Sequence, residues 1–367
     1  MLADAIPLDQ MQRVLVVKLR HHGDVLLTSP LFSALKAAVP GITIDALVYA
    51  DTAEMLTLHP DIAEVHTIDR HWKKLGPLAQ LRAELGLLGR LRSRRYDLVI
   101  HLTEHWRGAW LARLLGVRWA VTYRVPGRNR FWRASFSHQI PRAAAGKRHT
   151  VEAHLDALRR IGIQPDAAQR QLRLVAGAAA DAHIDRLLAG RQLAGRGFIH
   201  IHPTSRWLFK GWTTAGWVGL IDALQAEGWP VVLSAAADGR EQALVDAIMA
   251  ELAKPAISLA GQLSLKQLAA LTDRAVLFIG VDSAPMHIAA AMSTPTVVLF
   301  GPSGEHEWGP WNPCRPETFR VIASHHHTCR PCGLDGCGGG KVSDCLVSLS
   351  VAQVLAAAHG LLPASAE

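Results

Sequence analysis

Residues 13–49 read RVLVVKLRHHGDVLLTSPLFSALKAAVPGITIDALVY, and this stretch decides the fold. Arg13–Leu19 has the continuous apolar character of a buried strand. After a short loop, the apolar residues of 23–40 recur at steps of three and four, which predicts a helix that ends before Pro40-Gly41. Ile42–Tyr49 is a second strand. This order of elements predicts a parallel sheet covered by helices.

The alternation of strands and helices continues in two blocks. In the first, helices are predicted over 78–91 and near 106–115, and strands over 96–102 and near 119–123. Residues 142–197 are mostly helical, and a strand at 197–203 restarts the alternation. Further helices are predicted over 214–227, 240–253 and 284–292, and further strands over 230–234, 275–281 and 296–300. We therefore predict an α/β protein with two Rossmann-like, doubly wound parallel-sheet domains that face each other across a cleft.

The chain length supports this division. At 367 residues the chain exceeds the size at which one hydrophobic core stops growing, about 250–300 residues. We place the N-terminal domain at 1–180 and the C-terminal domain at 181–347. A terminal helical segment, 348–367, is expected to pack back on the first domain. Ligands of such folds bind beyond the carboxyl ends of the strands, so functional residues are expected in the loops that follow strands.

Composition and chain start indicate a cytoplasmic protein. Hydrophobic residues make up 49% of the chain and charged residues 19%, as in soluble globular proteins. The start, MLADAIPLDQMQR, lacks the basic and apolar regions of a secretory signal. The most apolar segments have only the length of strands, so no membrane span is expected.

Positive charge is concentrated in the first half. Residues 1–178 contain 26 Lys and Arg against 15 Asp and Glu, whereas residues 179–367 contain 13 against 16. A basic first half suits an acidic partner, such as an anionic glycan, a membrane surface or a nucleic acid. Arg124–Arg133, RVPGRNRFWR, interleaves arginines with aromatic residues in a turn-rich stretch. We interpret it either as the lining of an acceptor groove or as a set of solvated charges.

Four late cysteines raise the question of a metal. Cys329, Cys332, Cys337 and Cys345 form a Cys-x2-Cys-x4-Cys-x7-Cys pattern, and four thiolates suffice for a structural zinc. The spacing is shorter than that of paired zinc knuckles, and Gly338–Gly340 loosens the loop. The pattern therefore favours thiols without zinc, and we assign the cluster no catalytic role.

The loop after the first strand carries a carboxylate. In LRHHGDVLLT, residues 19–28, Gly23 is expected to permit a tight turn, and Asp24 then stands at the start of the helix. An ionised Asp there is a usable general base, but Asp is also a preferred N-cap residue. Spacing alone favours the cap. The G-x-G-x-x-G pattern of dinucleotide-binding folds is absent at this position, which argues against an NAD enzyme.

Two loops of the second block suit a diphosphate. His202–Trp212, HPTSRWLFKGW, offers the hydroxyls of Thr204 and Ser205 and the positive charges of Arg206 and Lys210. A polar surface turn is an equally good interpretation of this composition.

The other loop, Phe278–Ala291, reads FIGVDSAPMHIAAA. Ser283 can cap the next helix, and Pro285 suits its first turn, which leaves free amides for an anion. Asp282 and His287 flank that position. No Asp-x-Asp pair, with which metal-dependent sugar transferases hold a divalent ion, occurs in the sequence. Positive side chains and helix amides are therefore expected to hold a diphosphate without a metal.

These loops resemble those of the lipopolysaccharide heptosyltransferases of glycosyltransferase family 9, over nearly the whole chain. The resemblance rests on VLVVKLRHHGDVLLTSPLFSALK, YDLVIHLTEHW, HPTSRWLFKGW, GVDSAPMHIAAAMSTPTVVLFGPS and the following WGPW. The His-Gly-Asp form of the first run and the Phe-Lys-x-Trp form of the third favour the heptosyltransferase III subtype.

The resemblance implies a GT-B fold with an acceptor-binding first domain and an ADP-sugar-binding second domain. It implies inverting, metal-independent transfer of L-glycero-D-manno-heptose from ADP-heptose to an inner-core heptose, with heptose II as the expected acceptor. Asp24 matches the general base, which reverses the preference for a helix cap. The implied donor-binding residues are Thr204, Ser205, Arg206, Lys210, Glu241, Asp282, Ser283, Ala284 and His287. Residues assigned to the acceptor are Lys18, Arg20, His22, Arg128, Arg130 and Arg133.

The implied partners are the ADP-sugar donor and a lipid A–Kdo–heptose acceptor, met at the cytoplasmic face of the inner membrane, with no nucleic acid. No cofactor is required. Three alternatives stay open: a family 9 transferase that acts on another core sugar, a nucleotide-sugar epimerase with a tightly held nicotinamide, and a non-catalytic protein that binds glycans or nucleic acid.

Overall fold

The structure, a computed structural model, describes residues 6–141, 144 and 146–363. Residues 1–5, 142–143, 145 and 364–367 lie outside the described residues, and with them parts of the predicted helical stretch 142–197 and of the terminal segment 348–367. The chain divides into two compact units, Met1–Arg173 and Leu174–Glu367.

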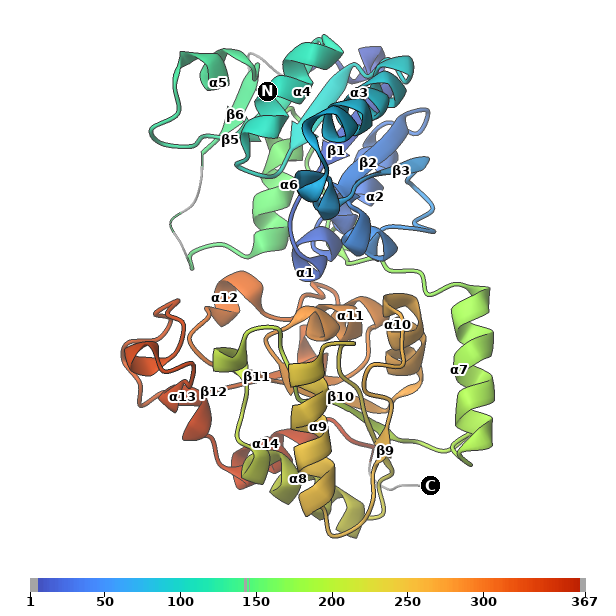
Figure 1. Cartoon of the computed structure of the whole chain (residues 1–367), viewed down its shortest axis with the longest axis vertical. Helices are drawn as coiled ribbons and strands as arrows, with labels where there is room; N and C mark the ends of the chain where they lie inside the picture. Colours follow the sequence, from blue (N-terminus) through green and yellow to red (C-terminus); the bar gives the residue numbers. More distant parts are fainter. Residues whose placement is uncertain (1–5, 142–143, 145, 364–367) are drawn as a thin grey trace. The chain divides into compact units, whose positions relative to one another are not determined.

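The first unit is built on a parallel sheet with the order β3-β2-β1-β4-β5-β6 (Figure 1). Val17, at the end of β1, pairs with Leu47 of β2 and with His101 of β4. The described strands are β1 (Arg13–Val17), β2 (Thr43–Tyr49), β3 (Glu64–Ile68), β4 (Leu98–His101), β5 (Trp119–Tyr123) and β6 (His138–Ile140).

Helices cover both faces of this sheet, as the alternating pattern predicts. Side chains of α3 and α4 pack on the sheet in one cluster that includes Leu87, Leu111 and Val99, and α2 packs against α6. The helices are α1 (His22–Leu26), α2 (Ser29–Ala38), α3 (Pro77–Ser93), α4 (Trp106–Leu115), α5 (Arg130–Ala134) and α6 (Thr150–Arg160).

The single helix expected over 23–40 is in fact two helices. The Thr28 hydroxyl donates to Val25 O at 2.6 Å and ends α1. Pro30 then occupies the first turn of α2, where its missing N–H costs nothing. Gly23 lies inside α1 rather than in a tight turn.

The second unit repeats this topology with the order β12-β11-β10-β7-β8-β9. Its strands are β7 (Ile199–His202), β8 (Val231–Leu233), β9 (Ile257–Ser258), β10 (Leu277–Val281), β11 (Thr296–Phe300) and β12 (Phe319–Ala323). Its helices are α7 (Ala178–Gly190), α8 (Thr214–Ala226), α9 (Gly239–Glu251), α10 (Leu265–Arg274), α11 (Ala284–Met292), α12 (Glu305–Trp308), α13 (Asp344–Val347) and α14 (Val351–His359).

The terminal helix α14 belongs to the core of the second unit. Val354 and Ala358 are buried in the cluster that includes Trp217 and Leu220 of α8, and α14 packs against α8. The apolar face of α14 is therefore used within the second unit.

Candidate functional site

The loops after β1, β7 and β10 lie at the points where the strand order of the two sheets reverses direction. In the first unit this switch point lies between β1 and β4, and in the second between β7 and β10. Open parallel sheets bind ligands beyond the carboxyl ends of the strands at this point, because the adjacent loops diverge there. The strand order, which the sequence does not give, thus explains why the loops after β1, β7 and β10 carry the polar residues.

Asp24 is held by a buried lysine at the first switch point. Nζ of Lys18 lies 3.6 Å from Oδ1 of Asp24. The same ammonium donates to the carbonyl of Leu102 at 3.3 Å and lies 2.9 Å from Nε2 of His154. Leu102 directly follows β4, so the lysine joins the ends of the two strands that flank the switch point.

His154 is a neutral acceptor in this network. Its Nδ1 lies 3.0 Å from the carbonyl of Leu27, so Nδ1 carries the hydrogen and donates it. Burial, together with the charge of Lys18, holds the pKa of His154 well below its usual value. Nε2 therefore accepts a hydrogen bond from Lys18. His154 lies 136 residues from Lys18 in sequence, and no motif of the sequence signals it.

Asp24 does not cap a helix. The N-cap position of α1 is His21, Asp24 lies in the first turn, and this helix end has no side-chain capping hydrogen bond. The carboxylate is half-buried, with 20% of its side chain exposed. The capping role is therefore excluded, and the carboxylate is directed toward Lys18 instead.

The residues assigned to the acceptor occupy three settings. Lys18 is buried, and the contacts described above turn its ammonium toward the protein rather than toward solvent. Arg20 is exposed, and its carbonyl accepts from Arg70 at 2.9 Å. Nε2 of His22 lies 2.9 Å from the carbonyl of Asp51.

The arginine-rich segment forms a separate aromatic cluster. The guanidinium of Arg128 lies 4.7 Å from the ring centre of Trp106 and 4.8 Å from that of Trp132. It donates to the carbonyl of Glu104 at 2.5 Å. Arg130 and Arg133 are exposed on α5. These two arginines remain accessible to an anionic ligand.

At the second switch point, Lys210 and Asp282 form a close ion pair. Nζ of Lys210 lies 2.6 Å from Oδ2 of Asp282, and the aspartate side chain is almost fully buried. The two residues come from the loops after β7 and β10, which the sequence predicts to share a ligand. The structure brings them together.

A buried chain of hydrogen bonds positions Thr204 and Glu241. The Thr204 hydroxyl donates to Oε2 of Glu241 at 2.6 Å and lies 3.2 Å from Nε2 of His202. Nδ1 of His202 lies 2.8 Å from the Ser234 hydroxyl, and Nε2 of His200 lies 2.7 Å from the same hydroxyl. Burial lowers the pKa of each histidine to about 3, so both are neutral. Sequence reasoning missed Ser234 and the role of His202, although His202 opens the quoted loop.

The other donor-loop residues are arranged around the start of α11. Ser283 is the N-cap residue but makes no capping bond, because its hydroxyl donates to the carbonyl of Val281 at 3.3 Å. Ala284 is the first residue of α11, and His287 is buried in its next turn. On the loop after β7, Ser205 is buried, whereas Arg206 is exposed with its guanidinium 5.4 Å from the ring centre of Trp207.

Among the described residues, the four cysteines are not found as a group whose possible metal-ligand atoms converge. Cys345 is buried and Cys329 and Cys337 are exposed. Burial raises the pKa of the Cys345 thiol. Within the described part of the chain, the only group of three or more metal-ligating side chains whose ligand atoms converge is Asp45, Glu64 and His66. A structural zinc at the cysteines therefore gains no support.

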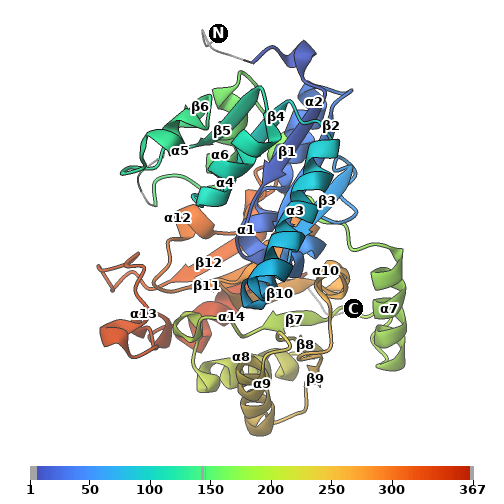
Figure 2. The same ribbon diagram turned by 45° about the horizontal axis from the view of Figure 1, so that its top comes forward.

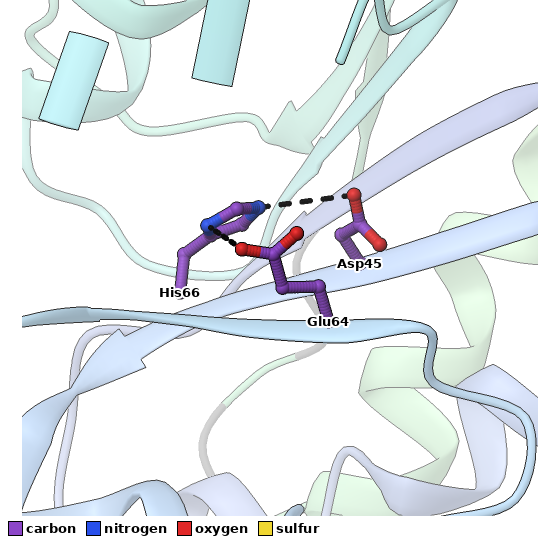
Figure 3. Close-up of side chains that lie close together, drawn as sticks. All are labelled: Asp45, Glu64 and His66. Carbon is purple, nitrogen blue, oxygen red and sulfur yellow. Dashed lines mark ion pairs between the residues drawn. The ribbon is translucent and has the colours of Figure 1, made fainter. Parts of the chain in front are cut away.

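Asp45, Glu64 and His66 form an ion-pair network rather than a metal site (Figure 3). The imidazole lies between the carboxylates, with Nε2 3.8 Å from Asp45 and Nδ1 3.2 Å from Glu64. Asp45 already accepts two hydrogen bonds from Arg94, at 2.7 and 2.9 Å, and one from Tyr96 at 2.7 Å. Although burial raises the pKa of Asp45, hydrogen bonds from His66, Arg94 and Tyr96 outweigh it and lower the pKa to about 2. The guanidinium therefore takes the place that a cation would need.

The chain is similar in sequence to known core-sugar transferases. The model of the family described as Glycosyltransferase family 9 (heptosyltransferase) matches residues 85–336. Lipopolysaccharide heptosyltransferase 3 of Escherichia coli is 38% identical over 298 residues, which cover 80% of this chain and 85% of that protein.

Solved structures confirm the predicted fold class. A family 9 glycosyl transferase from Veillonella parvula superposes with a TM-score of 0.82 at 20% identity, covering 98% of this chain and 99% of that one. Escherichia coli heptosyltransferase WaaC with ADP gives a TM-score of 0.71 at 20% identity, covering 94% and 98%. The α/β architecture with two parallel sheets is that of the GT-B fold. No helix among the described residues has the length and apolarity to cross a membrane.

Proposed function

Because the chain belongs to glycosyltransferase family 9, a family of lipopolysaccharide-core heptosyltransferases, we propose that it transfers L-glycero-D-manno-heptose from ADP-heptose to heptose II of the inner core. The acceptor hydroxyl attacks the anomeric carbon in one displacement, the bond to the ADP β-phosphate breaks, and the configuration inverts. The reaction takes place at the cytoplasmic face of the inner membrane.

Asp24 is the proposed general base, and this assignment carries the proposal. The carboxylate is half-buried at a switch point, it caps no helix, and a buried ammonium fixes its orientation. A positioned carboxylate that takes the proton from the attacking hydroxyl contributes typically 10²–10⁴-fold to the rate.

The donor diphosphate is assigned to the second switch point. Lys210 supplies the positive charge, and the start of α11 supplies the partial positive charge of a helix N-terminus. These groups stabilise the negative charge that develops on the leaving ADP, so the residues present suit transfer without a divalent ion. Thr204 and Glu241, fixed by the buried histidine chain, are the proposed contacts to the nucleotide ribose and phosphate.

The proposed acceptor carries carboxylates and phosphates, which agrees with the basic first half of the chain. Exposed arginines such as Arg130 and Arg133 are the proposed contacts to these groups. Lys18 is better assigned to holding Asp24 than to contacting the acceptor, because its ammonium is buried.

The test is to incubate the protein with ADP-heptose and a series of truncated core acceptors and to weigh the products. We expect one added heptose on acceptors that contain heptose II. In the Asp24→Ala variant we expect calorimetric ADP binding to persist while kcat falls at least about 100-fold. A kcat near that of the wild type would remove Asp24 from the mechanism. Addition only to acceptors that lack heptose II would redirect the proposal to another core sugar.

A further inference from the structure

Helix α3 carries an apolar stripe that faces solvent. Leu78, Leu81 and Leu85 are exposed, and 84% of the surface of Leu78 is accessible. Steps of three and four residues place them on one side of the helix. The helix already buries Leu87 and Leu91 against the sheet. The exposed leucines are therefore not part of the apolar face that packs α3 on the sheet.

Helix α4 carries a second exposed stripe. Trp106, Trp110 and Leu114 follow one another at four-residue steps, and each is exposed, Trp110 to 54%. The ring of Phe131 packs on Trp110 with the ring centres 4.7 Å apart. Large indole side chains at a surface are typical of positions that lie between water and an apolar phase.

The two stripes lie on neighbouring helices of one layer. Both α3 and α4 contribute to the same core cluster on one face of the first sheet, and the helices contact each other (Figures 1 and 2). Arg107 of α4 forms a bidentate pair with Glu84 of α3, and Arg92 of α3 donates to the carbonyl of Leu114. We call the outward sides of these two helices the α3–α4 face. It is defined by Leu78, Leu81, Leu85, Trp106, Trp110 and Leu114.

The two chain segments that form the α3–α4 face are rich in Lys and Arg. Residues 70–95 contain eight Lys and Arg and one Glu, and residues 104–134 contain seven Arg and one Glu. The excess positive charge of these two segments is larger than the net charge of the whole chain, which is +8. Several of these cations, including Lys73, Lys74, Arg82 and Arg90, are exposed. The surface around the apolar stripes is therefore complementary to an anionic one.

We propose that the α3–α4 face docks on the surface of an anionic lipid bilayer. Exposed leucines and tryptophans enter the boundary between head groups and acyl chains, while the surrounding Lys and Arg pair with lipid phosphates. A second copy of this chain is a poorer occupant, because two such faces would bring like charges together. The inference rests on the proposed function, in which the acceptor is anchored in a membrane.

The α3–α4 face begins at the same edge of the first sheet as the proposed general base. Helices α3 and α4 follow strands β3 and β4, so their first turns lie at the carboxyl edge of the sheet. Leu78, Leu81, Trp106 and Trp110 are in the first halves of these helices. Asp24, which follows β1, lies at the same edge. Docking through these side chains brings the lipid surface to the edge that carries the proposed base.

The test is co-sedimentation of the full-length protein with vesicles, without donor or acceptor. We expect binding to vesicles of phosphatidylethanolamine and phosphatidylglycerol, and little binding to phosphatidylcholine alone. The Leu78→Glu/Leu85→Glu variant should lower the partition coefficient at least about tenfold, since it removes apolar contact and adds repulsion. The matched control is Leu334→Glu/Val342→Glu in the second unit, whose residues are 60% and 53% exposed. It should bind as the wild type does.

Further readouts separate this inference from the proposed function. Vesicle binding does not depend on catalysis, so it can persist even if no heptose is transferred. Turnover of a deacylated, water-soluble acceptor should be unchanged in Leu78→Glu/Leu85→Glu. Partitioning of that variant within twofold of wild type overturns the inference, and so does equal binding of the wild type to neutral vesicles. A wild-type dimer that the same substitutions dissociate, with no vesicle binding, would assign the face to a second copy instead.

Discussion

Nζ of Lys18 lies 3.6 Å from Oδ1 of Asp24, with only 7% and 20% of the two side chains exposed. The Lys18 ammonium also contacts the carbonyl of Leu102 and Nε2 of His154, and these contacts hold it in place. The end of β4, the first turn of α1 and helix α6 thus each place one residue against the same ammonium. The orientation of the proposed base depends on all three.

Replacing Lys18 by Met should therefore disturb the base without touching the donor site. We expect kcat to fall about 10- to 100-fold, because the Asp24 carboxylate loses its partner and is no longer held in the position needed to accept the proton of the acceptor hydroxyl. ADP affinity, measured by calorimetry, should stay within twofold. Lys36→Met is a matched control, since Lys36 donates to the carbonyl of Ile42 in the same unit. Unchanged kcat in Lys18→Met would show that Asp24 needs no positioning partner.

Lys210→Ala should weaken both donor binding and turnover. The ammonium is the proposed counter-charge of the diphosphate, and removing a donor to a leaving group typically costs about 10²–10³-fold in kcat. We also expect ADP affinity to fall at least about tenfold. The exposed Lys254→Ala serves as the control for loss of one positive charge. If Lys210→Ala binds ADP as the wild type does, the diphosphate lies elsewhere.

Buried neutral histidines should make the protein sensitive to acid. Burial lowers the pKa values of His101, His200 and His202 to about 3. Below pH about 6.5 the unfolded chain binds protons that the folded chain does not, so the free energy of unfolding falls as the pH drops from about 6.5 towards 3. Each histidine contributes up to about 1.4 kcal/mol per pH unit.

The variant His101→Phe isolates one of these contributions. Its ring would remain stacked near Phe136 and edge-on to Trp132. We expect urea unfolding at pH 7.5 and pH 5.0 to show a smaller loss of stability than in the wild type. The exposed His71→Gln should leave the loss unchanged. Equal losses in His101→Phe and the wild type would contradict the buried neutral state.

Two glycines on adjacent helices should respond to alanine in opposite directions. A Cβ at Gly108 would lie 2.3 Å from a ring atom of His101, whereas a Cβ at Gly89 of α3 would meet nothing within 4 Å. Gly108→Ala should cost about 1–3 kcal/mol by overpacking. Gly89→Ala should gain about 0.5–1 kcal/mol in helix propensity. Thermal unfolding of the two variants checks the signs, and a rise in Tm for Gly108→Ala would mean that the ring can move aside.

Periodicity predicted most of the fold, because buried strands such as β1 and β10 are continuous apolar runs between turn residues. It did not predict the edge strand β12, whose residues are mostly half-buried and so lack a strong pattern. It also joined α1 and α2, since the Thr28–Pro30 break interrupts the backbone but not the apolar spacing.

The loops after strands were predicted from the sequence, and the structure confirms that Lys210 and Asp282 meet. The burial of Lys18 and the partnership with His154 could not be foreseen, because contacts across 136 residues depend on the tertiary fold. The leucines of α3 illustrate the same limit. The pattern of Leu78–Leu91 predicts a helix, but it cannot tell which leucines the sheet covers.

The shared strand order of the two sheets has an evolutionary consequence. Each unit encloses its own hydrophobic core and presents its own switch point. Mutations that reshape the loops of one half need not repack the other half. Under the proposed function, lineages can therefore change the acceptor sugar by altering the first unit, Met1–Arg173, while the second unit, to which nucleotide binding is assigned in the proposal, is inherited unchanged.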